Sequence, residues 1–268
     1  MSIELPKWVD GALNGLDLFS GIGGNTLGLR DYVNTIAYCE EDRHAQAVLL
    51  SRMSEGEIKP APIWNDVTTL KGSMFDQQMD IIIGGFPCQD ISVAGNGRGL
   101  EGERSGLFYE VCRLVKEIKP SFVFLENVPA IRTRGLREVI REFTNMGYDC
   151  RWTCVSAAEV GAPHLRKRWF LLAHTIGSGD RTQPKTMVRE KEKGQSDRTM
   201  SLSSCGTDTT RRPDMQHRGQ LQATNWEVEP SVGRMVDGLP LRVDRIKRLG
   251  NAVVPLQAKT AFKRLMGL

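Results

Sequence analysis

No apolar stretch of this chain approaches the roughly 20 residues that a helix needs to cross a bilayer. The segment from Met1 to Asp10 carries charged side chains and lacks the apolar run of a secretory signal. These two absences argue against a membrane or secreted protein. We therefore expect a cytoplasmic protein with no membrane partner.

Paired cysteines are also missing. The six cysteines are scattered, and no two of them have Cys-x-x-Cys spacing. Structural zinc sites usually need such pairs, so the sequence predicts no metal site. A chain of 268 residues can bury a sizeable core and needs no disulfide staples. Most of the cysteines are therefore expected to be small buried side chains in a reducing compartment.

Strong net charge is absent, because the formal charge is only +4. Most of it falls between Asp180 and Arg218, where nine basic residues outnumber six acidic ones. From about Thr175 to Asn225 large apolar residues are almost absent as well. Composition alone favours a flexible linker there, although a structureless stretch of this length inside a compact chain is usually functional.

The remainder of the chain alternates strand-like and helix-like segments. Strands are expected at 16–19, 35–39, 80–83, 121–125, 148–155 and 169–173. Helices are expected at 24–30, 42–53, 106–118 and 136–146, with a last helix whose core contacts include Phe262 and Leu265. This alternation indicates an α/β doubly wound sheet, in which ligands bind just beyond the strand ends.

Two features after the first strands suit a nucleotide-like cofactor. A glycine-rich turn occupies 17–24, but its glycine spacing differs from the dinucleotide fingerprint, which disfavours an NAD-dependent dehydrogenase. Glu40 ends the second strand, where a carboxylate often accepts hydrogen bonds from ribose, or serves only as a helix N-terminal acid. Asp66 is suited to an adenine amino group or to an N-cap.

Candidate reactive groups follow later strands. Cys88 lies in the Gly/Pro-shaped loop 84–90, a good position for a reactive thiol, although a lone cysteine is more often structural. Glu126 ends another strand on the same expected edge, and burial near a cysteine would keep it protonated as a proton donor. Strand alternation places His164, Arg166 and Arg168 on one face, which is also the pattern of a basic edge strand.

In their order along the chain, these segments resemble the DNA (cytosine-5)-methyltransferase family of bacteria and phages. The resemblance covers roughly 16–173 and 232–268. It implies a Rossmann-like sheet that binds S-adenosylmethionine, with a small target-recognition domain. The expected divisions are a catalytic domain at 1–174, the target-recognition domain at 175–231 and a C-terminal return to the catalytic domain at 232–268.

The resemblance also implies roles for particular residues. The implied catalytic residues are Cys88, Glu126, Arg166 and Arg168. The implied cofactor-binding residues are Phe19, Gly21, Ile22, Gly23, Gly24, Glu40, Glu41, Asp66, Val67, Gly84, Phe86, Pro87, Leu107, Asn251, Ala252 and Val253. The expected DNA contacts are Gln89, Ser92, Asn127, Arg211, Arg212, Gln216 and Gln220.

Two positions depart from the family pattern. His164 stands where the family usually has Gln, and both side chains can donate a hydrogen bond. Glu41 stands where an apolar residue often packs on adenine, and we expect Ile22 and Val67 to supply that surface.

The implied activity is methyl transfer from S-adenosylmethionine to carbon 5 of cytosine, leaving S-adenosylhomocysteine. The expected enzyme is monomeric and nucleoid-associated. It flips its cytosine out of duplex DNA at a short recognition sequence, as a solitary or phage methylase or beside a cognate restriction endonuclease. A tRNA cytosine-5 methyltransferase of the same fold and a catalytically silent DNA-binding regulator are the alternatives.

Overall fold

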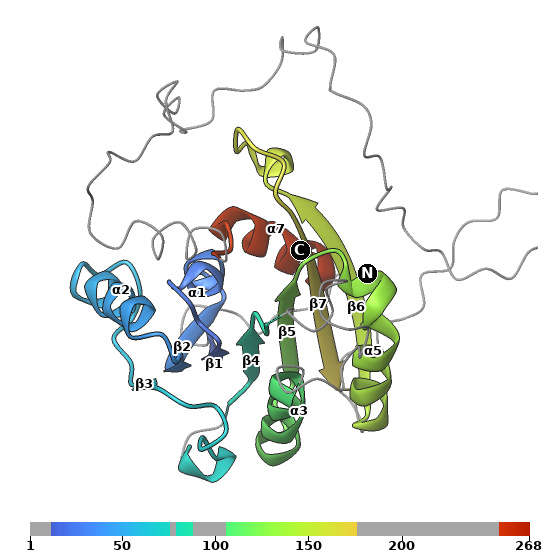
Figure 1. Cartoon of the computed structure of the whole chain (residues 1–268), viewed down its shortest axis with the longest axis horizontal. Coiled ribbons are helices and arrows are strands. Elements are labelled where there is room, and N and C mark those ends of the chain that lie inside the picture. The colour runs from blue at the N-terminus through green and yellow to red at the C-terminus, as the bar shows by residue number, and fades with distance from the viewer. Residues whose placement is uncertain (1–11, 76–78, 88–105, 176–251) are drawn as a thin grey trace, which may run out of the picture.

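The computed structural model describes residues 12–75, 79–87, 106–175 and 252–268. Within these ranges, no helix has both the length and the apolar character required to cross a membrane. The described residues form one central sheet with helices against both of its faces (Figure 1).

The sheet has seven strands in the order β3-β2-β1-β4-β5-β7-β6. Their bounds are β1 Leu13–Leu18, β2 Val33–Cys39, β3 Ile63–Trp64, β4 Ile81–Gly84, β5 Phe122–Asn127, β6 Tyr148–Ser156 and β7 Lys167–Thr175. β1 to β5 are parallel, whereas β7 runs antiparallel to both β5 and β6. Strand order reverses between β1 and β4, which is where doubly wound sheets bind ligands.

Helices cover both faces because the central strands are apolar on both sides. Ile82 packs on the face covered by α3 and α5, whereas Ile81 and Ile83 pack on the face covered by α7 (Figure 1). Continuous apolar runs of this kind are typical of parallel strands buried on both faces. The helices are α1 Gly24–Leu29, α2 Arg43–Ser54, α3 Gly106–Ile118, α4 Ile131–Arg134, α5 Leu136–Asn145 and α7 Pro255–Met266, with 3₁₀ turns η1 Gly72–Met74 and η3 Ala158–Val160.

The C-terminal helix α7 packs against α1, which lies near the N-terminal end of the described residues. Gly28 of α1 lies directly against the backbone carbonyl of Pro255, and a Cβ at Gly28 would come within 2.9 Å of the Ala258 Cβ. A Cβ at Gly24 would lie 2.5 Å from the Val253 carbonyl oxygen. Glycine at both positions therefore permits α1 to contact the start of α7 at backbone distance.

The expected α/β doubly wound class is confirmed, and the longer strands and helices agree closely with the expected ones, whereas the short β3 and α4 were not expected. Asp42 caps α2, because its side chain accepts hydrogen bonds from the backbone N–H groups of His44 and Ala45. Phe262 and Leu265 are buried in the core as expected. Helix α7 begins at Pro255, where the missing N–H of proline costs a helix nothing.

The α1–α7 contact makes Gly28 a sensitive position. Alanine is the better helix former, by about 1 kcal/mol. However, Gly28→Ala forces the methyl group against the Pro255 carbonyl, and overpacking of this kind costs about 1–3 kcal/mol. We expect a net loss of stability, seen as a Tm lower by several degrees in thermal unfolding.

Gly106→Ala is the matched control, because a Cβ at the first residue of α3 meets nothing within 4 Å. It should leave Tm unchanged or slightly raised. Equal Tm values for the two variants would contradict the close contact between α1 and α7.

Candidate active site

The direction of β7 determines which side chains meet at one edge of the sheet. β4 and β5 both end at this edge, and Asn127 at the end of β5 pairs with Trp169 near the start of β7. Because β7 is antiparallel, its first residues lie beside the last residues of β5. Arg166 and Arg168 lie on either side of Lys167, the first residue of β7. They therefore lie at the same edge of the sheet as Glu126, which is near the end of β5.

The glycine-rich turn after β1 has a backbone that favours glycine. Gly21 and Gly23 have φ angles of 54° and 83°, in the left-handed region. Phe19 also has a positive φ of 53°, an uncommon and strained conformation for a residue with a side chain. The Ser20 hydroxyl donates a 2.6 Å hydrogen bond to the Asp17 carbonyl and closes the turn.

Asp17 supports this turn from inside the sheet. Its carboxyl group is fully buried and accepts a 2.5 Å hydrogen bond from the hydroxyl of Thr26 on α1. Burial raises the pKa of Asp17 to about 7, against the hydrogen bond from Thr26, which lowers it. This supporting role of Asp17 was not predicted, although an acidic residue inside an apolar strand is a signal that the sequence carries.

Glu40 connects the end of β2 to the glycine turn. Its carboxylate accepts hydrogen bonds from the backbone N–H of Gly21 at 2.7 Å and of Asp42 at 2.8 Å. Burial raises the pKa of Glu40, and the two backbone hydrogen bonds oppose that shift. The carboxylate is thus fixed in orientation beside the turn, and its remaining lone pairs are available to hydroxyl donors.

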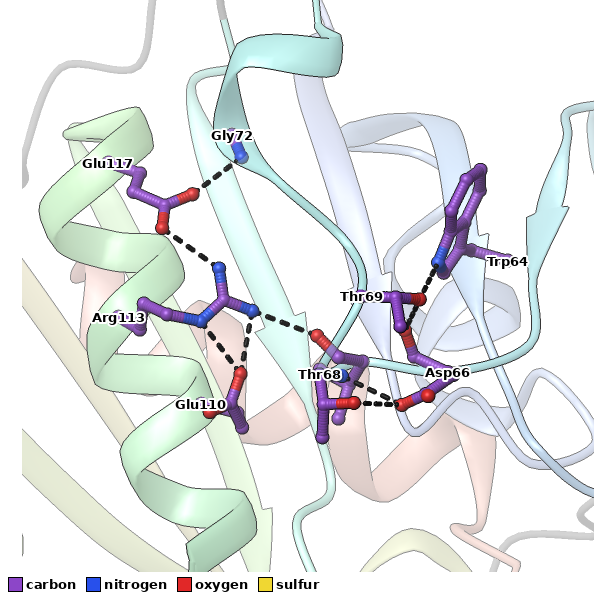
Figure 2. A network of polar contacts seen from close by, with 9 residues as sticks. Trp64, Asp66, Thr68, Thr69, Gly72, Glu110, Arg113 and Glu117 are labelled. Atoms are coloured by element: carbon purple, nitrogen blue, oxygen red, sulfur yellow. Dashed lines mark hydrogen bonds and ion pairs between the residues drawn. The ribbon is translucent and has the colours of Figure 1, made fainter.

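Asp66 lies on the segment after β3 and is exposed. One carboxylate oxygen accepts hydrogen bonds from the Thr68 backbone N–H at 2.9 Å and the Thr68 hydroxyl at 2.7 Å (Figure 2). These hydrogen bonds lower the pKa of Asp66 and keep it ionised. The side chain closes a local turn, and its conformation is fixed before any ligand arrives.

Glu126 and Arg168 form a buried ion pair. Glu126 Oε1 lies 2.8 Å from Arg168 Nε, with side chains only 10% and 13% exposed. Burial raises the pKa of Glu126 to about 7, although the charges of Arg168 and Arg166 oppose the shift. A Cβ at Gly85 would lie 3.0 Å from Glu126 Oε2, so glycine there lets the carboxyl group approach the loop after β4.

Asn127 holds that loop in place. Its side chain is 3% exposed, donates a 3.1 Å hydrogen bond to the Phe86 carbonyl and accepts one from the Val128 N–H at 2.8 Å. It therefore fixes the backbone just before Pro87, the last described residue of the loop. A DNA contact by Asn127 stays a prediction, because its side chain here is turned into the protein.

The C-terminal segment is attached to the same edge. Arg166 donates a hydrogen bond to the Ala252 carbonyl. The buried Gln257 amide donates to the carbonyls of Val155 at 2.9 Å and Arg166 at 2.6 Å. Gln257 joins α7, β6 and the start of β7, a role that no local sequence pattern predicts.

The remaining predicted cofactor residues differ in exposure. Val67 is only 6% exposed and packs into the main core, which leaves little of its surface for an adenine ring. Phe19 and Leu107 are partly buried against that same core, Ile22 is half-buried, and Glu41 and His164 are exposed. Phe19, Ile22 and Leu107 thus retain apolar surface that a ligand can contact.

Several predicted residues lie outside the described part of the chain. These are Cys88, Gln89, Ser92, Asn251, Arg211, Arg212, Gln216 and Gln220, together with nearly all of the expected target-recognition domain at 175–231.

An apolar pocket of about 350 Å3 lies elsewhere in the described structure, against β2 and β3. It is lined by Ile36, Ala37, Tyr38, Pro62, Trp64, Leu70, Met74 and Phe75. None of these is a predicted site residue, so we do not assign the pocket to the candidate active site.

Known proteins resemble this chain over more than half of its length. It is 40% identical over 159 residues to the Type II methyltransferase M.CviJI of Paramecium bursaria Chlorella virus IL3A, covering 59% of this chain and 42% of that protein. It is 34% identical over 162 residues to the Type II methyltransferase M.HhaI of Haemophilus parahaemolyticus, covering 59% and 47%. The chain thus spans about half the length of the curated relatives it matches.

Solved structures of methyltransferases also resemble this chain. A protein described as a DNA modification methyltransferase encoded within an E. coli prophage is 31% identical, with a TM-score of 0.50 over 61% of this chain and 47% of that one. The Dnmt2 methyltransferase of S. pombe, at 23% identity and a TM-score of 0.50 over 63% and 52%, shares the fold.

The family model for C-5 cytosine-specific DNA methylases matches residues 13–233, well over half of the sequence. The glycine turn, the buried Glu126–Arg168 pair and the loop ending at Pro87 all lie within that match. This chain therefore belongs to the C-5 cytosine-specific DNA methylase family.

Proposed function

We propose that this protein transfers a methyl group from S-adenosylmethionine to carbon 5 of a cytosine in double-stranded DNA. The observation that carries the proposal is the buried Glu126–Arg168 pair, beside the loop that leads into Cys88 and close to the sheet's switch point. A carboxyl group with a pKa near 7, next to a fixed cation, suits proton transfer to a base.

The residues at the glycine turn fit S-adenosylmethionine. The oriented carboxylate of Glu40 suits the two ribose hydroxyls, and the second oxygen of Asp66 suits the adenine amino group. Glycine at position 21 leaves open space above the turn, since a Cβ there meets nothing within 4 Å. When bound there, the cofactor supplies a methyl group activated by the positive charge on its sulfur.

Cys88 is the proposed nucleophile. Its thiolate attacks carbon 6 of cytosine, and the ring becomes electron-rich enough at carbon 5 to accept a methyl group. Glu126 donates a proton or a strong hydrogen bond to ring nitrogen 3 as negative charge develops there. Arg168 holds the Glu126 carboxyl group and polarises oxygen O2. Loss of the carbon-5 proton to a base then breaks the bond between Cys88 and carbon 6.

Cytosine stacked in a duplex cannot reach this edge, so we propose that the enzyme flips it out, at a cost of a few kcal/mol. Residues 175–231 are the proposed target-recognition domain, whose basic side chains contact phosphates and whose Arg and Gln side chains read base edges. The relatives named Type II methyltransferases support a restriction–modification setting, in which a cognate endonuclease cuts the same sequence. We propose that the protein acts as a monomer.

The activity is tested with radiolabelled S-adenosylmethionine and two acceptors, duplex DNA and tRNA. Cys88→Ala should abolish methyl transfer to DNA while S-adenosylhomocysteine still binds, because the thiolate takes no part in holding the cofactor. Wild-type protein should form a covalent adduct with duplex DNA that contains 5-fluorocytosine. Bisulfite sequencing of the methylated product then identifies the modified base and the recognition sequence.

Cys150→Ala is the matched control, because Cys150 is a free cysteine on β6, among the strand residues that face α5. It should retain full activity. Methyl transfer to tRNA but not to DNA would favour the RNA-directed alternative. Cofactor and DNA binding without transfer or adduct would favour a silent regulator.

The pKa of Glu126 gives the reaction a pH signature. The acid form predominates below about pH 7, so the rate should fall as pH rises through that value. Glu126→Gln cannot give up a proton. We therefore expect kcat to drop about 100-fold or more, with loss of this alkaline limb. Single-turnover rates from pH 5.5 to 9 measure both effects.

Glu138→Gln is the matched control, since Glu138 pairs with Arg141 on α5, outside the candidate site. It should leave the pH profile unchanged. If Glu126→Gln weakened DNA binding but kept the wild-type single-turnover rate, Glu126 would have a structural role and the assignment would be wrong.

A further inference from the structure

Arg113 of α3 lies at the centre of a polar network that no step of the proposed reaction uses (Figure 2). Its guanidinium group donates to Glu110 from Nε at 2.7 Å, to Glu117 from Nη1 at 2.9 Å and to the Val67 carbonyl from Nη2 at 2.9 Å. The two carboxylates on either side hold the planar group in one orientation. The contact with Val67 crosses from the helix to the segment that follows β3.

A second contact joins the same two elements. Glu117 uses one oxygen for Arg113 and the other to accept a 2.7 Å hydrogen bond from the Gly72 backbone N–H (Figure 2). A Cβ at Gly72 would lie 2.8 Å from the Glu117 Cβ, so glycine allows this close approach. Val67 and Gly72 are thus both hydrogen-bonded to side chains of α3, Val67 through its carbonyl and Gly72 through its N–H.

The segment that these hydrogen bonds hold, residues 66–72, begins with Asp66, which the proposed function assigns to binding the adenine amino group. The start of α3 carries Leu107, which is partly buried and keeps exposed surface. Each element thus carries one predicted cofactor-binding residue, and we treat the two elements as two walls of the proposed cofactor pocket. The Val67–Arg113 and Gly72–Glu117 hydrogen bonds both link these two walls.

Apolar packing already anchors each wall to the sheet. α3 buries Phe108, Val111 and Leu114, and the segment after β3 buries Val67 and Leu70. Partly exposed ion pairs add little to the stability of a folded protein, and the Arg113 side chain is 30% exposed. Loss of Arg113 should therefore leave both elements folded while freeing them to shift against each other.

We propose that Arg113 is a positioning residue for the cofactor, which sets the separation between Asp66 and Leu107 through its hydrogen bond to Val67. This inference rests on the proposed function. It assigns to Arg113 an effect on cofactor affinity and none on the chemical step, because the guanidinium group binds Glu110, Glu117 and Val67 and contacts neither Glu126 nor Arg168.

Arg113→Met tests the proposal, since methionine keeps the apolar stem and the helix propensity but removes every donor. Calorimetric titration with S-adenosylhomocysteine should give a Kd about tenfold above wild type. The KM for S-adenosylmethionine should rise by a similar factor. The kcat at saturating cofactor and the Kd for duplex DNA should stay within about twofold, and a merely structural defect would not produce this separation.

Arg264→Met is the matched control, because Arg264 of α7 makes the same kind of partly exposed ion pair with Glu159 of η3, and neither residue belongs to the two walls. It should bind S-adenosylhomocysteine as wild type does. Gly72→Ala is a second test, since it forces the same two elements apart and leaves Arg113 intact. It should reproduce the rise in Kd with an unchanged kcat.

Three outcomes would overturn the inference. The first is a Kd for S-adenosylhomocysteine within twofold of wild type in Arg113→Met, which would leave the proposed function standing. The second is an equal loss of kcat and cofactor affinity, which would mean that Arg113 only supports the fold. The third is wild-type protein that binds no S-adenosylhomocysteine, which would overturn the proposed function as well.

Discussion

The ion pair between Glu126 and Arg168 depends on the direction of a single strand. Glu126 is at the end of β5, and Arg168 is at the start of β7. The two side chains meet only because β7 is antiparallel to β5. A seventh strand in the parallel direction would carry Arg168 to the opposite edge and leave the Glu126 carboxyl group buried without its counter-charge.

Burying such an ion pair costs desolvation free energy, and this desolvation accounts for the shifted pKa of Glu126. Removing a carboxylate and a guanidinium from water costs several kcal/mol for each, and their attraction repays this only when the geometry is good. Here burial raises the pKa of Glu126, Arg168 and Arg166 lower it, and the balance lies at about 7. A fully exposed carboxyl group would stay ionised at that pH, and an unpaired buried one would stay protonated. The pair therefore places Glu126 where both protonation states are accessible.

The pattern of the sequence was sufficient for the longer elements and for the order of the motifs, because apolar periodicity and turn residues are local signals. It did not predict the two-residue strand β3 or the four-residue helix α4, which are too short to show a period. It was not sufficient for the direction of β7, since periodicity marks a strand without saying which way it runs. Pairs such as Arg113 with Val67, or Gln257 with Arg166, join residues far apart in the chain. They could be recognised only once the fold had brought them together. The burial of Val67 is of the same kind: its place in the core follows from α3 packing over it.

The two halves of the sheet differ in charge, and the difference matches the two reactants proposed for them. The half built on β1, β2 and β3 presents the carboxylates of Glu40 and Asp66, an environment that favours a positively charged sulfonium. The half built on β4, β5 and β7 presents two guanidinium groups, those of Arg166 and Arg168, against the one carboxyl group of Glu126. This balance suits the proposed polyanion and a cytosine ring that gains negative charge during attack. The halves meet at the switch point between β1 and β4, where we propose that the methyl donor and the cytosine approach each other. If the acidic groups lay on the β4, β5 and β7 half and the basic groups on the other half, both proposed reactants would be repelled. The sign of the charge on each half therefore contributes to the site as much as any single side chain does.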